Sequence, residues 1–152
     1  VRGTFACSQA CIPHLARAPN AHILNLSPPL NMDGKWFRDH TAYTMSKYGM
    51  SMCTLGMSAE LARNGIAVNS LWPRTTIATA AIEVNFPAEV LQASRKPAIM
   101  ADAAYAIFNR DSRRHSGNFY IDEAVLREEG VAEFEHYALK PGARLYTDLF
   151  LD

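Results

Sequence analysis

The sequence lacks several features that mark membrane, secreted and nucleic-acid-binding proteins. Its 152 residues hold no apolar run near the ~20 residues of a membrane-spanning helix, and no secretory signal opens them. Acidic and basic residues balance at 15 each, so no surplus charge favours nucleic acid or an anionic membrane. We therefore expect an intracellular, soluble protein that has no nucleic-acid partner and no membrane span.

Cysteine is also scarce. The three residues Cys7, Cys11 and Cys53 fit a reducing compartment better than a disulfide framework. Cys7, Cys11 and His14 share one face of a predicted helix and could be imagined as metal ligands, but no fourth ligand lies at a suitable spacing. Small thiols commonly fill helix cores, so we expect a core role for the cysteines and no metal.

The pattern of apolar residues predicts alternating strands and helices in one domain at most. Short apolar runs predict strands at residues 22–27, 66–72 and 118–122. Helical spacing predicts helices at residues 4–18, 41–63, 77–84, 87–94 and 102–109, with a charged helix in the tail. Alternation of this kind predicts an α/β fold, a parallel sheet with helices on its faces.

The helix at residues 41–63 is apolar on more than one face. Asn64 and Gly65 follow it in the manner of a C-terminal cap. A helix of this kind must be covered on two sides. We expect its own sheet to cover one side and a partner subunit the other, so that a homo-oligomer forms through this helix and the helix at residues 4–18.

The same helix carries Tyr43 and Lys47, which are four residues apart and therefore lie on one helical face. An ammonium there can lower the pKa of the phenol, which is ~10 in an unperturbed tyrosine. Reaching neutrality takes a shift of roughly three units, about 4 kcal/mol. One ammonium at ~4 Å supplies that much at an effective dielectric constant of about 20. By itself, however, such a pair is most often a lysine stem beside a half-buried ring.

Five segments together resemble the short-chain dehydrogenase/reductase family from residue 1 to about residue 122. They are R-G-T-F in the first helix, H-I-L-N-L-S, Y-T-M-S-K, G-I-A-V-N-S-L-W-P and the closing G-N-F-Y-I-D. Their order and spacing agree, which is far more specific than any one motif. The resemblance implies a Rossmann-like, doubly wound parallel sheet. It also implies an oxidoreductase that transfers a hydride between a nicotinamide cofactor and an alcohol or ketone.

The resemblance further implies roles for individual residues. Tyr43 would be the general acid/base, and Lys47 would lower its pKa and hold the ribose hydroxyls of the nicotinamide nucleotide. Tyr43 would also contact the cofactor. Asn25, at a strand end, would be a structural residue near the cofactor. The nicotinamide carboxamide would be contacted by residues that follow the second strand: Pro73, Ile77 and Thr79. The cofactor would be NADP or NAD. The choice between them is normally set by a segment that follows the second strand of the family fold, and that strand is not among these 152 residues.

One position departs from the family pattern. The family places a catalytic serine three residues after the strand asparagine, and here that position is Pro28. Ser27 precedes it, but alternation along a strand directs neighbouring side chains to opposite faces. The serine polarises the substrate oxygen, and losing one such donor typically costs ~3–4 kcal/mol, roughly 10²–10³ in rate. Either Ser27 takes that catalytic role, or another donor from the following loop replaces it, or the activity is weak.

A second departure is the absence of a Gly-rich turn between a strand and a helix. In this fold a dinucleotide pyrophosphate sits at that turn, on a helix N-terminus. We therefore expect residues 1–122 to be the C-terminal part of a partial Rossmann domain, without its N-terminal strands, and residues 123–152 to be a C-terminal extension. The fragment alone should bind cofactor poorly and be inactive, whereas the full-length protein should be an enzyme.

Substrate and location are predicted only by class. The loop at residues 29–40 and the segment at residues 75–96 would form an apolar pocket for a lipid-like alcohol or ketone. Its apolar residues would be Leu30, Met32, Trp36, Phe37, Ile82 and Phe86. The protein would be cytoplasmic in a bacterium and peroxisomal or mitochondrial in an animal. The alternative is a catalytically impaired Rossmann scaffold or interaction module. Pro28 favours it, as does Arg74, which follows Pro73 where the family prefers glycine; the intact Tyr43 and Lys47 oppose it.

Overall fold

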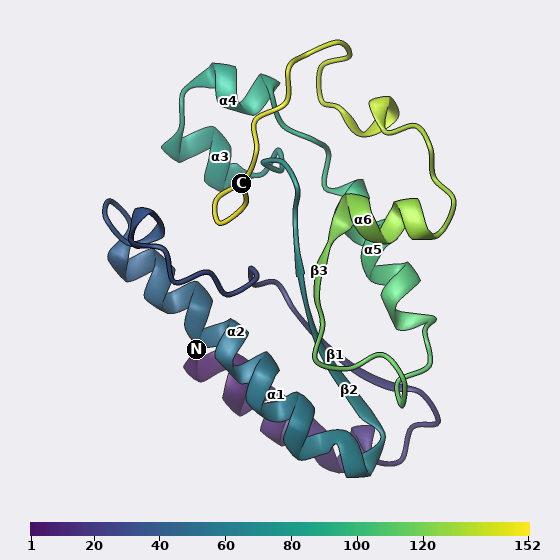
Figure 1. The fold of residues 1–152 in the computed structure, drawn as a ribbon. Helices are drawn as coiled ribbons and strands as arrows, with labels where there is room; N and C mark the ends of the chain where they lie inside the picture. Colours follow the sequence, from purple (N-terminus) through teal and green to yellow (C-terminus); the bar gives the residue numbers. More distant parts are fainter. The chain divides into compact units, whose positions relative to one another are not determined.

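The computed structural model describes all residues from 1 to 152. They form two compact units: Val1–Trp72 with Phe108–Tyr120, and Pro73–Ile107 with Ile121–Asp152. Figure 1 shows the chain coloured along its sequence. The division into the C-terminal part of a Rossmann domain at residues 1–122 and an extension at residues 123–152 stays a prediction.

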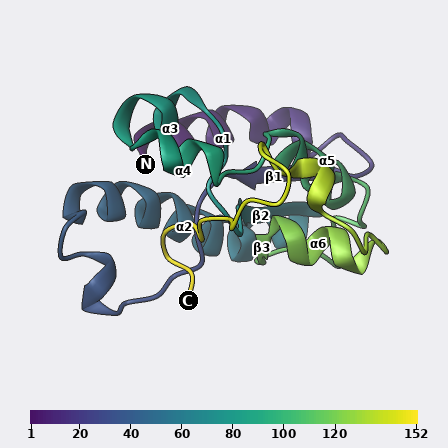
Figure 2. The ribbon, with the colours of Figure 1, turned by 90° about the horizontal axis from the view of Figure 1, so that it is seen from above.

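The first unit is built on a parallel sheet. β1 (Ala21–Asn25) pairs in parallel with β2 (Ile66–Trp72), in a register that places Asn25 opposite Ser70. β3 (Phe119–Ile121) follows β2 in the strand order β1-β2-β3 (Figure 2). Every residue of β2 is buried, as is typical of a parallel strand covered on both faces. The predicted α/β fold with a parallel sheet is confirmed.

Two long helices accompany these strands (Figures 1 and 2). α1 (Arg2–Leu15) packs against β1, and α2 (Thr41–Leu61) packs along β2. α2 continues into a short 3-10 helix, η2 (Ala62–Asn64), which ends at Gly65. The φ of Gly65 is 69°, in the left-handed region that glycine adopts without strain. The predicted helix and its glycine cap are confirmed, whereas α1 begins and ends earlier than predicted.

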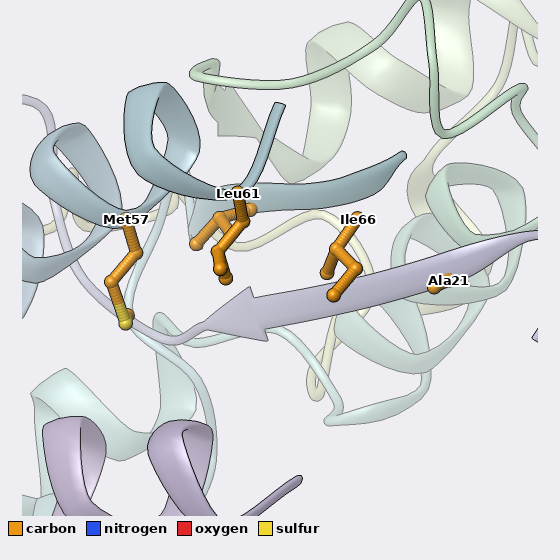
Figure 3. Close-up of a cluster of buried hydrophobic side chains, with 5 residues drawn as sticks. Ala21, Met57, Leu61 and Ile66 are labelled. Atoms are coloured by element: carbon orange, nitrogen blue, oxygen red, sulfur yellow. The ribbon is translucent and has the colours of Figure 1, made fainter. Parts of the chain in front are cut away.

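A buried cluster joins both helices to the sheet (Figure 3). Met57 and Leu61 of α2 and Ile66 of β2 lie beside β1. Burying a side chain of this size stabilises a fold by about 1.5–3 kcal/mol. The other buried members and the partly buried residues packed against them are Ala21, Val68, Ile12, Leu15, Ile23 and Cys53. The cluster therefore holds the C-terminal half of α2 against the strands.

The expected core role is wrong for two of the three cysteines. Cys7 and Cys11 are exposed on α1. Ser8, Ile12 and Leu15 are turned inward instead: Ser8 is buried, and Ile12 and Leu15 pack against the cluster. These three positions follow one another at helical spacing and occupy the inward face, so the two thiols lie off that face.

The second unit consists of short helices and a C-terminal tail. Its helical elements are α3 (Ala80–Asn85), α4 (Ala88–Gln92), α5 (Ala98–Phe108), α6 (Asp122–Glu128) and η3 (Glu135–Tyr137). The predicted short helices are present with shifted ends. Several backbone hydrogen bonds hold the tail in place. Among them, the Lys96 amide donates to the Tyr137 carbonyl at 2.7 Å, and the Leu139 amide donates to the Ser94 carbonyl at 2.9 Å. No helix of either unit combines the length and the apolar character that crossing a membrane requires.

A buried carboxylate anchors the chain segment that follows β2. The Oδ1 atom of the buried Asp122 accepts hydrogen bonds from the backbone amides of Arg74, at 2.8 Å, and Glu123, at 2.6 Å. Burial raises the pKa of the Asp122 carboxyl, and the two amides and Arg95 oppose that rise. Arg95 forms an ion pair with Glu123 at 2.6 Å and lies over the Phe134 ring. These contacts hold the residues directly after β2 within the second unit.

Candidate active site

Tyr43 and Lys47 lie one turn apart on α2. The Tyr43 side chain is exposed and Lys47 is half-buried. The Lys47 ammonium donates a hydrogen bond to the Leu26 carbonyl at 3.0 Å, directly after β1, and lies 5.1 Å from the centre of the Trp72 ring, at the end of β2. The ammonium is therefore held at the carboxyl ends of two adjacent parallel strands, the edge at which open α/β sheets bind their ligands.

The loop between β1 and α2 is fastened to the same helix. Three hydroxyls of α2 donate to backbone carbonyls of the loop. The pairs are Thr44 to Trp36 at 2.5 Å, Tyr48 to Asn31 at 2.7 Å and Ser51 to Pro28 at 2.6 Å. Burial raises the pKa of the Tyr48 phenol, so this hydroxyl keeps its proton and remains a donor. The loop predicted to line the pocket is therefore held by the helix that carries Tyr43.

Ser27 lies in a buried chain of hydroxyl groups. Its Oγ is 2.9 Å from the Oγ of Ser70, which donates to Oγ1 of Thr54 at 2.8 Å. Asn25 donates to the same Oγ1 atom from Nδ2, also at 2.8 Å. None of these four side chains is exposed, and Ser27 has no solvent-accessible surface. This row of hydrogen-bonded side chains joins β1, β2 and α2. It places the Ser27 hydroxyl in the interior, whereas the Tyr43 side chain is exposed.

The other residues predicted to contact the nicotinamide lie in the second unit. Pro73 is buried and directly follows β2. Ile77 pairs with Arg95 through a parallel backbone bridge. Thr79 is exposed and precedes α3, and its carbonyl accepts the amides of Ile82 and Glu83. The first unit thus contains Asn25, Ser27, Tyr43 and Lys47, and the remaining three predicted residues belong to the second.

Several polar residues of the site were missed in the sequence. Ser51, Thr54 and Ser70 are buried and hydrogen-bonded. The sequence holds a signal for two of them. Lys47, Ser51 and Thr54 follow one another at spacings of four and three residues, which places a polar stripe along one face of the helix. Such a stripe indicates a face that meets polar groups of the sheet rather than its apolar core.

We expect Thr54→Val to destabilise the full-length protein by about 2–4 kcal/mol. Valine keeps the shape of the side chain but removes the oxygen that accepts from Asn25 and Ser70. Each buried donor left without a partner costs about 1–3 kcal/mol. Urea denaturation measures the effect, and Thr54→Ser, which keeps the oxygen, is the matched control. Equal stability of the valine and serine variants would show that the hydrogen bonds accepted by Thr54 do not stabilise the fold.

Lys47 and Tyr43 are the residues of the first unit that could hold a nicotinamide ribose. A lysine ammonium has three N–H donors, and a phenol both donates and accepts, so together they suit a pair of neighbouring hydroxyls. The Leu26 carbonyl takes one of the ammonium donors and sets its direction. The donor set therefore fits the sugar of the cofactor that the sequence predicts.

Comparison with known proteins decides the family. The family model for short chain dehydrogenases matches residues 1–89. The chain belongs to this family. It is 55% identical over 152 residues to hydroxysteroid dehydrogenase-like protein 2 of Danio rerio, covering 100% of this chain and 36% of that protein. The Homo sapiens protein of the same name is 52% identical over 151 residues, which cover 99% of this chain and 36% of that protein.

Solved structures of similar proteins agree with this short-chain dehydrogenase assignment. A short chain dehydrogenase from Mycobacterium thermoresistibile has a TM-score of 0.90 and 49% identity, over 100% of this chain and 54% of that one. A protein from Xanthomonas campestris has a TM-score of 0.93 and 47% identity, over 99% of this chain and 55% of that one. The predicted partial Rossmann-like fold is confirmed. The chain spans about a third of the length of these curated relatives, 36%, and members of the family are oxidoreductases that generally bind NAD or NADP.

Proposed function

We propose that the full-length protein is an NAD(P)-dependent oxidoreductase that interconverts an alcohol and a ketone, with Tyr43 and Lys47 as its catalytic residues. The observation that carries this proposal is the position of the Lys47 ammonium. It is bound to the Leu26 carbonyl at the strand ends, one helical turn from the exposed Tyr43. Within a short-chain dehydrogenase, that is where a proton donor and a ribose-binding cation are both needed.

Each side chain has a distinct task in the reaction. The bound nicotinamide supplies or accepts the hydride. In ketone reduction the Tyr43 hydroxyl gives its proton to the carbonyl oxygen as that oxygen becomes negative, and in alcohol oxidation the phenolate takes the proton back. The Lys47 ammonium stabilises the phenolate electrostatically and binds the ribose hydroxyls. Exposure of Tyr43 leaves its hydroxyl accessible to a substrate.

The remaining predicted residues receive supporting roles in this proposal. Asn25 and Ser27 hold the end of β1 through the buried hydroxyl chain, and a donor from the loop at residues 29–40 polarises the substrate oxygen. Contacts to the nicotinamide carboxamide come from the segment that follows β2: Pro73, Ile77 and Thr79. These 152 residues contain no Gly-rich turn for a pyrophosphate, so we propose that they are inactive by themselves.

The proposed substrate is lipid-like, and the proposed assembly is a homo-oligomer. The loop fastened to α2 carries Leu30, Met32, Trp36 and Phe37, which suit an apolar substrate. α1 and α2 both expose large apolar side chains, among them Phe5, Met45, Met52 and Leu55. A second copy of the protein would cover these side chains. Either NADP or NAD is compatible with the proposal.

A catalytically impaired scaffold is the second candidate function. It is favoured by Pro28, which occupies the position of the catalytic serine, and by the complete burial of the neighbouring Ser27 hydroxyl. Such a protein would bind the nucleotide through Lys47 but transfer hydride slowly or not at all. Binding without turnover is therefore the result that separates the second candidate from the first.

The test uses the full-length protein with NADH and NADPH. Quenching or enhancement of nicotinamide fluorescence measures cofactor binding, and absorbance of the reduced nicotinamide measures turnover with a panel of lipid-like ketones. We expect binding of at least one cofactor and turnover of at least one long-chain or polycyclic ketone. Binding without turnover across the panel would support the scaffold, and no binding of either cofactor would contradict both candidates.

A further inference from the structure

The ring of Trp72 lies next to the Lys47 ammonium. Trp72 is the last residue of β2 and is only 5% exposed. The Lys47 Nζ atom lies 5.1 Å from the centre of its ring, within the range of a cation–π interaction. The Leu26 carbonyl, at 3.0 Å, is a second contact of the same nitrogen. The ammonium is therefore held between a ring at the end of one strand and a carbonyl just beyond the end of its neighbour.

A lysine needs such support more than most catalytic residues do. Its charge sits on a flexible stem of four carbons, and fixing that stem costs side-chain entropy. Tryptophan provides the strongest cation–π attraction of the aromatic side chains, and the attraction grows where the ring is shielded from water. A carbonyl fixes one donor direction, while the face of a ring restrains the ammonium without taking up one of its N–H donors in a conventional hydrogen bond.

We propose that Trp72 is a positioning residue for catalysis. It keeps the Lys47 ammonium at the strand ends, where the ammonium can stabilise the Tyr43 phenolate and bind the ribose hydroxyls. This proposal rests on the function proposed above for Lys47. The alternative is that the Trp72 ring only fills space between β2 and α2. The two views differ in a testable way, because space filling depends on the size of the ring and positioning depends on its electron density.

The test places tryptophan analogues with increasing numbers of fluorine atoms at position 72 of the full-length protein. Fluorine withdraws electrons from the ring face and weakens a cation–π contact with little change in shape. The first readout is the pH midpoint of kcat/KM for alcohol oxidation, which needs the Tyr43 phenolate. A less firmly held ammonium stabilises the phenolate less, so we expect the midpoint to rise with each added fluorine. A midpoint that stays constant along the series would overturn the proposal.

The second readout needs no turnover. In the wild type, the ring current of Trp72 should shift the NMR signals of the Lys47 methylene protons next to the nitrogen. We expect Trp72→Phe to keep a smaller shift and Trp72→Leu to remove it.

At neutral pH, Trp72→Leu should also lower kcat/KM about tenfold. Should the leucine variant fail to fold, the fluorinated series still decides.

A matched control removes another cation–π pair of the first unit. Arg110 lies 5.2 Å from the Tyr120 ring, and we expect Tyr120→Leu to leave the Lys47 signals and the pH midpoint unchanged. Identical Lys47 signals in the wild type and in Trp72→Leu would contradict positioning by Trp72. If the wild type shows the Lys47 shift but no hydride transfer with any substrate, the proposed enzyme function fails while the contact itself stands.

Discussion

Tyr43→Phe is expected to lower kcat of the full-length protein by about 10²–10⁴-fold while leaving cofactor binding nearly intact. The substitution removes only the phenolic oxygen, so the carbonyl or alcohol loses its proton donor or acceptor, and such groups contribute factors of this size. The Tyr43 side chain is 44% exposed, so the loss of one oxygen should not disturb the fold. Steady-state kinetics measures kcat, and nicotinamide fluorescence measures the dissociation constant of the cofactor.

The matched control for this variant is Tyr105→Phe. Tyr105 lies on α5 in the second unit and is 73% exposed, so its variant removes the same atom from a tyrosine to which no role is assigned. We expect it to behave as the wild type. Retained turnover in Tyr43→Phe would show that Tyr43 is not the proton donor and acceptor. The assignment of the chain to the short-chain dehydrogenase family would still hold.

Lys47→Met should have the second-largest effect, a loss of about 10²–10³-fold in kcat/KM. The variant keeps most of the apolar stem but removes the charge that stabilises the Tyr43 phenolate, an interaction of about 4 kcal/mol for charges ~4 Å apart at an effective dielectric constant of about 20. It also removes the donor to the ribose, so cofactor binding should weaken as well. This combined loss distinguishes Lys47 from Tyr43, whose variant should lower kcat and leave cofactor binding nearly intact.

The control for Lys47 is Lys47→Arg, which keeps a positive charge in a different shape. Arginine is planar and longer, so it should recover part of the phenolate stabilisation but bind the Leu26 carbonyl and the ribose in a changed geometry. We expect its kcat/KM to lie between those of the wild type and the methionine variant. A methionine variant with normal cofactor affinity would contradict the ribose-binding role.

The elements that carry the site could be predicted because their signals are local. β2 has the predicted bounds, since a mostly apolar run between Gly65 and Pro73 leaves little choice. α2 begins at the predicted residue and reaches its glycine cap through one turn of 3-10 helix. The spacing of Tyr43 and Lys47 follows from helix geometry alone. Local pattern therefore predicted both the scaffold and the pair at its edge.

The surroundings of the pair could not be predicted in the same way. The buried hydroxyl chain joins Asn25 and Ser27 to Thr54 and Ser70, residues separated by 16 to 43 positions. Such contacts depend on how the strands and α2 pack, and a serine or threonine in the sequence shows no preference for one distant partner over another. The same limit explains why the contact between Lys47 and the Trp72 ring had no signature in the sequence.

The exposed cysteines illustrate a further limit. Hydrophobic spacing on α1 is compatible with more than one inward face, because Cys7 and Cys11 lie one position before Ser8 and Ile12 and are therefore rotated by about a quarter of a turn. The structure turns Ser8 and Ile12 inward. Only the position of β1 and α2 decides which of these neighbouring faces is buried.

The most direct test of the account is single-turnover hydride transfer in the full-length protein, with wild type and Tyr43→Phe compared side by side. The enzyme loaded with reduced nicotinamide is mixed with a ketone found active in the substrate panel, and nicotinamide absorbance is followed in time. We predict rapid loss of the reduced nicotinamide in the wild type and loss at least about 10²-fold slower in the variant. Equal rates in the two proteins would contradict the account.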